Sequence, residues 1–268
     1  MERSSYALFL AYKGTSFNGF ARQKEDHVLT VQAVVEEALA TVLRLDTVPQ
    51  TVCAGRTDAG VHALSQVLSF EIEQAAIERR QRGQIVRALN ALTPRDISIK
   101  ELRLTQPGFS ARFDAQWREY RYYVFNESSP PVFAEGFSWH LPKPLDLDLM
   151  RQASRHLVGE HDFRSFCTST SAPLSKNTVR EINTIDIDEE DIRGEKLIVI
   201  RVVGTAFLHS MVRIIAGTLC DIGVGKHSPD DILDMLAAKD RRAAGQTAPA
   251  AGLSFFHVDY PQQVFVSE

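Results

Sequence analysis

The alternation of apolar and polar residues predicts a regular order of strands and helices in the first half of the chain. Residues 5–12 are rich in aromatic and aliphatic side chains and end at Lys13-Gly14, a pattern typical of a strand followed by a turn. Behind Thr30, a favourable N-cap, apolar residues recur at helical spacing, which predicts an amphipathic helix to about residue 45. Further strands are expected at 51–54, 64–72 and 97–104, and a second helix at 75–92. The resulting order, β-α-β-β-α-β, is that of the split βαβ or ferredoxin-like arrangement, in which helices pack on one face of an antiparallel sheet.

The rest of the chain predicts a second unit of the same kind. An aromatic-rich strand at 113–125 extends the first sheet, and a proline-containing linker follows over about 127–145. Asp146 is suited to be the N-cap of a helix over 147–157. Strands are then expected at 179–188, 196–204 and 254–260, and helices at 207–222 and 229–238. We therefore predict an α+β fold made of two ferredoxin-like halves with antiparallel sheets, residues 1–126 and residues 146–268.

Length and composition agree with a soluble globular protein. At 268 residues, with 44% hydrophobic and 24% charged residues, the chain is long enough for two cores and is neither disordered nor a disulfide scaffold. The three cysteines, Cys53, Cys167 and Cys220, are far apart and form no C-x-x-C pair, which favours a reducing compartment and argues against structural zinc. No apolar run is long enough for a membrane helix, and the N-terminus lacks a signal-type apolar core. A cytoplasmic location is expected.

The net charge argues against a protein that coats nucleic acid without specificity. The chain has 30 basic and 34 acidic residues, a formal charge of −4. The two signs are nevertheless segregated, because an acidic run occupies residues 186–191 while many arginines fall in the first half. A local basic surface for RNA and two ordinary solvated faces are both compatible with this pattern.

The loop at residues 54–63 carries the most chemistry. Gly55 and Gly60 bracket Arg56 and Asp58 between two short apolar segments. Glycines allow backbone angles that other residues avoid, so such a loop can aim Asp58 at a ligand while Arg56 keeps it ionised. In this interpretation the carboxylate is a fixed nucleophile or base. The alternative is a turn that closes a hairpin, with Arg56 and Asp58 as a surface ion pair.

The run Gly55-Arg56-Thr57-Asp58-Ala59-Gly60-Val61-His62 resembles the signature loop of the tRNA pseudouridine synthase A family. Further motifs similar to those of the family follow in matching order: T-V-Q at 30–32, F-x-A-R-F at 109–113, R-x-Y-x-Y at 118–122, F-L-x-x-M-V-R-x-I-x-G at 207–217 and A-P-x-x-G-L at 248–253. Together they span roughly residues 6 to 260. Phe20-Ala21 departs from the Trp-Gln pair that is usual in the family, so that segment predicts no substrate contacts.

The resemblance implies a fold and a reaction. The fold is that of the pseudouridine synthases, with the two halves joined around a central RNA-binding cleft. The reaction is the isomerisation of uridine to pseudouridine in tRNA, in which the N-glycosidic bond breaks and the base rejoins the ribose through C5. The resemblance implies no cofactor, since nothing is oxidised and no group is imported. Asp58 matches the catalytic aspartate, which either adds covalently to the nucleoside or removes a ribose proton to give a glycal-like intermediate. Both routes remain open.

Four further residues are assigned to the site through the same resemblance. Tyr120 matches the active-site tyrosine, whose ring stacks on the extracted uracil while its hydroxyl assists removal of the C5 proton. Arg56 and Arg213 are expected to bind substrate beside Asp58, and Leu253 to contact it as well. Each has an ordinary alternative: a surface ion pair with Asp58 for Arg56, a strand aromatic for Tyr120, a rim residue that snorkels from the core for Arg213, and core packing for Leu253.

The histidines and glycines predict no other catalytic centre. His62 and His209 have no partner at metal-ligand spacing, and a structural hydrogen bond is expected for His62. No metal site is predicted. The chain has no phosphate-binding loop of the G-x-x-x-x-G-K-[ST] kind, so nucleotide hydrolysis is not expected either.

The expected partners follow from the family as well. The substrate is tRNA, modified in the anticodon stem-loop at positions 38, 39 and 40, and a homodimer would let the second subunit bind the elbow. No membrane partner is expected. Two competing functions remain: an RNA-binding module without catalysis, which would need no placed carboxylate, and a hydrolase with a carboxylate pair, for which Glu71 and Glu73 carry no motif.

Overall fold

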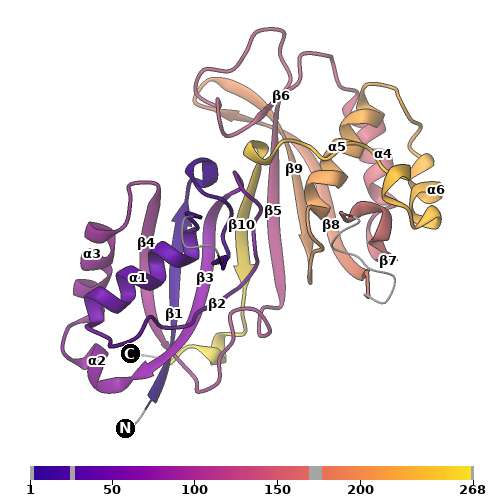
Figure 1. The fold of residues 1–268 in the computed structure, drawn as a ribbon. Helices are drawn as coiled ribbons and strands as arrows, with labels where there is room; N and C mark the ends of the chain where they lie inside the picture. The colour runs from indigo at the N-terminus through magenta and orange to yellow at the C-terminus, as the bar shows by residue number, and fades with distance from the viewer. Residues whose placement is uncertain (1–2, 25–27, 169–176, 267–268) are drawn as a thin grey trace. The chain divides into compact units, whose positions relative to one another are not determined.

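The computed structural model describes residues 3–24, 28–168 and 177–266, and the chain forms two compact units (Figure 1). Unit 1 consists of residues 1–116 together with 255–268, and unit 2 consists of residues 117–254. Each unit is built from antiparallel strands and helices, which confirms the predicted α+β class. No helix in the described part of the chain is long and apolar enough to cross a membrane.

Unit 1 has the ferredoxin-like strand order. The strands β1 (Arg3–Tyr12), β3 (His62–Glu73) and β4 (Ile97–Thr105) lie in the order β4-β1-β3, and β2 (Val52–Cys53) pairs with β3. All of these pairs are antiparallel. β10 (Leu253–Asp259) begins in unit 2 and continues in unit 1, where it also adjoins β3. The predicted β-α-β-β-α-β order is confirmed.

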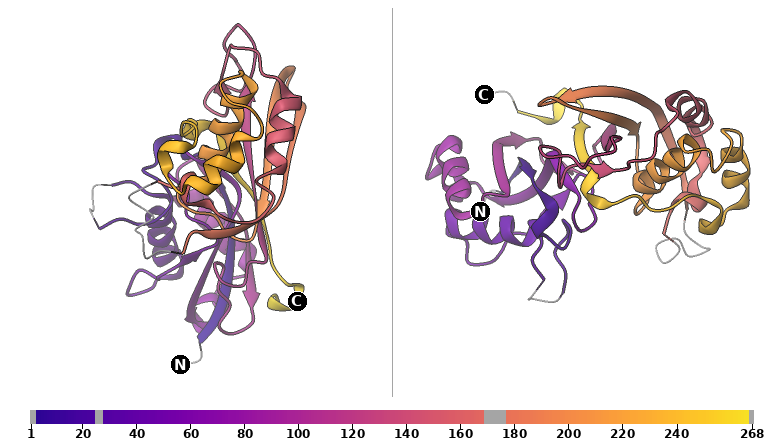
Figure 2. Two further views of the ribbon diagram at one scale, coloured as in Figure 1. Left: turned by 90° about the vertical axis from the view of Figure 1, so that its right-hand side faces the viewer. Right: turned by 90° about the horizontal axis from the view of Figure 1, so that it is seen from above.

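The helices of unit 1 cover one face of its sheet, as the two views of Figure 2 show. They are α1 (Val31–Leu43), α2 (Gln74–Glu78) and α3 (Arg82–Leu92). Thr30 caps α1 as predicted, since its hydroxyl accepts from the Ala33 N–H. The prediction of one helix over 75–92 was wrong. The chain breaks after α2, and Gln81 starts α3 with a capping box to Gln84.

Unit 2 follows the order β-α-β-β-α, with two additional short strands. Its strands β5 (Trp117–Phe125), β9 (Glu195–Gly204), β8 (Val179–Ile192) and β7 (Gly159–Asp162) follow the order β5-β9-β8-β7. The short β6 (Trp139–His140) runs parallel to β5. Its helices are α4 (Leu147–Arg155), α5 (Met211–Gly223) and α6 (Asp231–Ala238). Asp146 caps α4 as predicted, because its carboxylate accepts from the backbone of Asp148 and Leu149.

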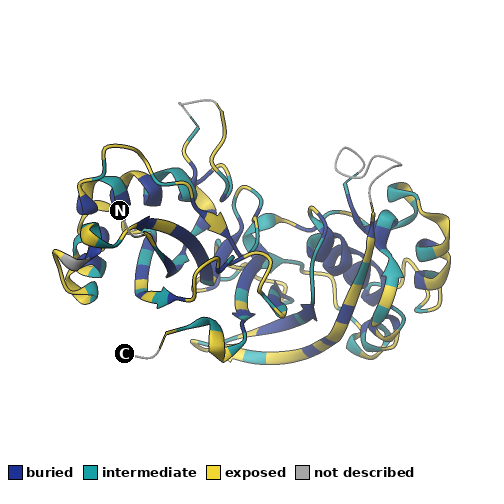
Figure 3. Ribbon diagram, turned by 90° about the horizontal axis from the view of Figure 1, so that it is seen from below, coloured by how far each residue is buried: buried dark blue, intermediate teal, exposed yellow. Residues whose placement is uncertain are grey.

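Short 3-10 helices complete both units, at Gly14–Ser16, Phe163–Phe166, Arg241–Ala243, Ala250–Gly252 and Gln262–Val264. Buried residues follow the strands and the inner sides of the helices in each unit (Figure 3). Buried and more exposed positions alternate on β4 from Ile97 to Lys100, with the period of two that a strand with one covered face requires. A bulge in the pairing with β1 then shifts the next buried position to Leu102.

The division between the units falls before β5. β5 pairs with β9 from Arg118 to Phe125, which makes this strand part of unit 2. The predicted linker over 127–145 also lies within unit 2, where the Glu195 carboxylate accepts backbone N–H groups of residues 132–134. The C-terminal segment belongs to unit 1, because Tyr260 packs edge-on against Phe109 and donates to the carbonyl of Ala111.

The strand predicted over 113–125 begins four residues later in the structure, at residue 117. Asp114 and Ser110 exchange hydrogen bonds in a tight turn, and the side chain of Phe113 between them is 78% exposed. The turn ends before β5 begins at Trp117.

Candidate active site

The loop between β2 and β3, residues 54–61, presents Asp58 on unit 1. We call it the Asp58 loop. Arg56 is exposed, Thr57 is buried and Asp58 is half-buried. The N–H of Val61 donates to the carbonyl of Asp58 at 3.2 Å, so a tight turn follows the carboxylate. This turn passes through Gly60 at φ +80°, a conformation that glycine adopts without strain. Arg56 and Asp58 therefore come together on one loop.

Three hydrogen bonds from outside the Asp58 loop hold its first half. The side-chain amide of Gln66, on β3, donates to the carbonyl of Gly55 at 2.7 Å. The hydroxyls of Tyr12 and Thr57 share a buried hydrogen bond of 2.8 Å. The N–H of Phe20 donates to the carbonyl of Thr57 at 3.1 Å. The backbone on the N-terminal side of Asp58 is thus fixed by residues far from it in sequence.

The hydroxyl of Tyr12 stays protonated at neutral pH. Burial raises the pKa of Tyr12, and the side-chain hydrogen bonds with Thr57 and Gln66 offset only part of that rise. A neutral hydroxyl can donate one hydrogen bond and accept others, which matches a group placed between two polar side chains. Tyr12 and Gln66 were not predicted as site residues. The one available signal was a polar residue, Gln66, inside the apolar run of β3.

The second half of the Asp58 loop rests on η1 (Gly14–Ser16). The N–H of Gly14 donates to Nδ1 of His62 at 3.1 Å, so the lone pair of this buried ring nitrogen is engaged. This bond confirms the structural hydrogen bond predicted for His62. A Cβ atom at Gly14 would lie 2.0 Å from the carbonyl oxygen of Val61, so only glycine fits this contact.

The segment with the Phe20-Ala21 departure lies against the same loop. Phe20 is fully buried, and its ring packs on that of Tyr12 with centroids 5.7 Å apart. Arg22 forms a 2.7 Å salt bridge with Glu36 of α1, whose buried carboxylate also accepts from the N–H and the hydroxyl of Thr51. The aromatic residue at position 20 is therefore part of the core beneath the Asp58 loop.

On unit 2, Tyr120 is fixed by the strand ladder. It is opposite Val202 in the β5–β9 pair, and its side chain is almost completely buried. Its ring meets Phe207 edge-to-face, with centroids 5.0 Å apart. The neighbouring Glu119 accepts from Arg121 at 2.8 Å and from Arg201 at 3.2 Å. Burial raises the pKa of Glu119, but the two guanidinium groups outweigh burial and lower it overall.

Arg213 and Leu253 are joined through the loop at 248–253. Nε of Arg213, on α5, donates to the carbonyl of Ala248 at 2.8 Å, and the N–H of Ala248 donates back to the carbonyl of Arg213. The hydroxyl of Tyr122 donates to the carbonyl of Pro249 at 2.8 Å. Leu253 follows as the first residue of β10 and is buried. Three separate sequence motifs of unit 2 therefore contact one another.

No cluster of metal ligands is present among the described residues. The site residues thus fall into two groups, Arg56 and Asp58 on a loop of unit 1 and Tyr120, Arg213 and Leu253 on regular elements of unit 2 and their connection.

Comparison with known proteins identifies the family. The tRNA pseudouridine synthase family model matches residues 9–114 and 153–261. The tRNA pseudouridine synthase A of Bacillus velezensis is 45% identical over 251 residues, which cover 94% of this chain and 97% of the relative. The proteins of the same name from Bacillus subtilis and Shouchella clausii are 43% and 41% identical and cover 94% and 99% of this chain, with 97% of each relative covered. The first matched segment includes the Asp58 loop, and the second includes α5 with Arg213. The chain therefore belongs to the tRNA pseudouridine synthase family.

Proposed function

We propose that this protein isomerises uridine to pseudouridine at positions 38, 39 and 40 of the anticodon stem-loop of tRNA. Membership of the family makes it an isomerase that acts on tRNA uridine. The observation that carries the mechanism is the Asp58 loop, in which a half-buried carboxylate sits on a backbone fixed from both sides. The anticodon positions and the roles of single residues are the new part of the proposal.

The reaction needs a group that acts at the ribose. The bond between N1 of uracil and C1′ breaks, the base turns, a bond forms between C5 and C1′, C5 loses a proton and N1 gains one. Substrate and product have the same composition, so no oxidant or group donor is consumed. Asp58 acts either as a nucleophile on C1′ or as a base on a ribose proton, and both roles require an ionised carboxylate held in place.

Tyr120 is proposed to contact the base. An RNA base has to leave its stack before its glycosidic bond can be attacked, and an aromatic ring offsets part of that cost. The hydroxyl of Tyr120 is suited to the C5 proton, since a phenol can accept and donate one proton. Tyr120→Phe separates the two roles. A large loss of turnover assigns the hydroxyl to proton transfer, while a small loss leaves the ring as a stacking surface.

Arg56, Arg213 and Leu253 are proposed to bind the substrate. Arg56 is exposed two residues before Asp58, where a guanidinium can meet a phosphate or a displaced base. Arg213 is anchored through Nε to the carbonyl of Ala248, and its planar positive charge suits a phosphate group. Leu253 would contribute an apolar contact to the base.

The wider context of the proposal is a cytoplasmic homodimer in which the second subunit binds the elbow of the tRNA. A tRNA is long relative to one 30.0 kDa chain, which is the physical reason for a second subunit. Sedimentation at micromolar concentration tests the dimer, and full activity of a strict monomer would remove it.

The test of the reaction is tritium release from tRNA transcripts labelled at C5 of uridine. Asp58→Asn removes charge and nucleophilicity but almost no volume, so we expect normal folding and tRNA binding with turnover lowered at least about a thousandfold. Transcripts with one uridine at position 38, 39 or 40 then map the site. No release by the wild-type protein, with tight binding of tRNA, would instead favour a binding module without catalysis.

A further inference from the structure

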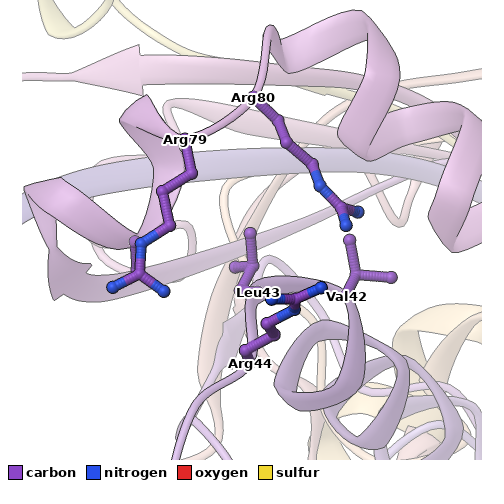
Figure 4. A pocket seen from close by; sticks show the side chains of 6 residues that line it. Val42, Leu43, Arg44, Arg79 and Arg80 are labelled. Carbon is purple, nitrogen blue, oxygen red and sulfur yellow. The ribbon is translucent and has the colours of Figure 1, made fainter.

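A basic surface pocket lies on unit 1, at the end of α1 (Figure 4). It has a volume of about 190 Å³. Its lining consists of three arginines and three apolar residues, namely Arg44, Arg79, Arg80, Val42, Leu43 and Ala76. Arg44 follows α1 in the left-handed conformation, and Arg79 and Arg80 follow α2. The C-terminal ends of two different helices therefore bring three arginines to one pocket.

The three arginines of the pocket differ from many other arginines of the protein. Arg22, Arg103 and Arg201 each form a salt bridge with a glutamate. Among the side chains that the structure describes, Arg44, Arg79 and Arg80 have no such acidic partner, and all three are exposed. Figure 4 shows the side chains of Arg44 and Arg80 extending toward the same part of the pocket, near Val42. The pocket is therefore a site of concentrated positive charge.

Such a site matches the chemistry of a phosphate group. Guanidinium groups repel one another, and an anion bound between them relieves that repulsion while it accepts paired N–H···O bonds from the planar forks. The carbonyls at the C-terminus of α1 also attract cations, but that attraction fades within the last turn. Because the chain as a whole has a formal charge of −4, its affinity for RNA has to come from local clusters of this kind.

We propose that the pocket formed by Arg44, Arg79 and Arg80 binds a phosphodiester of the tRNA backbone, outside the catalytic residues. This inference rests on the proposed function, because it assumes that tRNA is the substrate. Backbone contacts position an RNA without reading its sequence. The pocket then contributes to affinity and to its salt dependence but takes no part in the chemical step.

The test is the double variant Arg44→Gln/Arg80→Gln. We expect its Kd for unmodified tRNA and its KM to rise about tenfold, with kcat unchanged, and the slope of log Kd against log salt to fall by about two. The matched control is Arg95→Gln/Arg193→Gln, which removes the same charge from exposed positions outside the pocket. Arg193 also matches Arg44 in backbone conformation, with φ of 59° and 53°. Equal Kd values and equal slopes for both double variants would overturn the proposal.

Two further measurements separate the possible failures. Binding is measured in the Asp58→Asn background, where it is independent of turnover, so absence of tritium release by the wild type would remove the proposed function without deciding the pocket. Inorganic phosphate is titrated against each variant by calorimetry. Phosphate binding that depends on Arg44 and Arg80, with tRNA affinity unchanged, would make the pocket a site for free anions and overturn the assignment to RNA. A thermal unfolding curve that matches the wild type shows that the double variant is folded.

Discussion

The two groups of candidate site residues are held in place by different means. On unit 1, Asp58 lies on an irregular loop whose position depends on hydrogen bonds with Tyr12 and Gln66 and on the close approach of Gly14 to Val61. On unit 2, Tyr120 is one residue of a regular strand that pairs with β9 along its length. A strand fixes its residues through a repeated ladder, while a loop needs separate partners for each peptide group. The loop is therefore the part of the site that a single remote substitution can displace.

The difference also has a functional side. A nucleophile or base has to meet its target atom within a fraction of an ångström, whereas a stacking surface tolerates small shifts. In the proposed mechanism, strict placement is required of Asp58, and its loop is held by hydrogen bonds from Tyr12 and Gln66. The following predictions compare the two regions, beginning with the largest expected effect.

Gly14→Ala is expected to have the largest effect. Its Cβ atom would lie 2.0 Å from the carbonyl oxygen of Val61, which is backbone and has to move. We expect turnover to fall about a hundredfold from a shift of the Asp58 loop, and unfolding free energy to fall by about 1–3 kcal/mol. Tritium release and denaturant unfolding measure the two effects. Gly83→Ala is the control, because nothing lies within 4 Å of its Cβ position. Turnover of Gly14→Ala at the wild-type level would show that the loop is not placed by this contact.

Tyr12→Phe comes next. It removes the hydroxyl that bonds to Thr57 and leaves the buried ring in place. The buried Thr57 hydroxyl loses a partner, so unfolding free energy should fall by about 1–2 kcal/mol. We expect kcat to fall about tenfold through looser placement of Asp58, with KM for tRNA unchanged. Single-turnover kinetics measure the chemical step. An unchanged kcat together with lower stability would reduce Tyr12 to a residue of the core.

These two residues also show where prediction from sequence ends. Apolar periodicity and caps, which are local properties, predict the helix over residues 31–43. They also predict the strand that carries Tyr120 and the strands on either side of the Asp58 loop. The partners of the Asp58 loop do not, because Tyr12 and Gln66 meet it only after the sheet has formed. The break between α2 and α3 was missed for a related reason, since the capping box at Gln81 uses glutamines that also suit a helix interior.

Tyr122→Phe is the same change in the other region. It removes the hydroxyl that donates to the carbonyl of Pro249 at 2.8 Å. The loss of unfolding free energy should equal that of Tyr12→Phe, about 1–2 kcal/mol. Turnover should change by less than about threefold, because the β5 ladder still fixes Tyr120. The two variants measured side by side test the comparison directly, and a larger loss of kcat for Tyr122→Phe would reverse it.

Glu119→Gln is expected to have the smallest effect, on stability alone. The pKa of Glu119 is lowered in the folded protein, because Arg201 and Arg121 outweigh the opposing effect of burial. A lowered pKa means that the unfolded chain binds the proton more readily than the folded protein does. The ionised carboxylate therefore stabilises the fold at pH values above 4.5, its ordinary pKa. This contribution is lost as the pH falls below 4.5 and through the folded pKa. The difference in unfolding free energy between wild type and Glu119→Gln should therefore be largest near neutral pH and shrink in acid. Denaturant titrations at neutral pH and in acid measure it, and a difference that stays constant would mean that the ion pairs beside Tyr120 add nothing to the framework of β5.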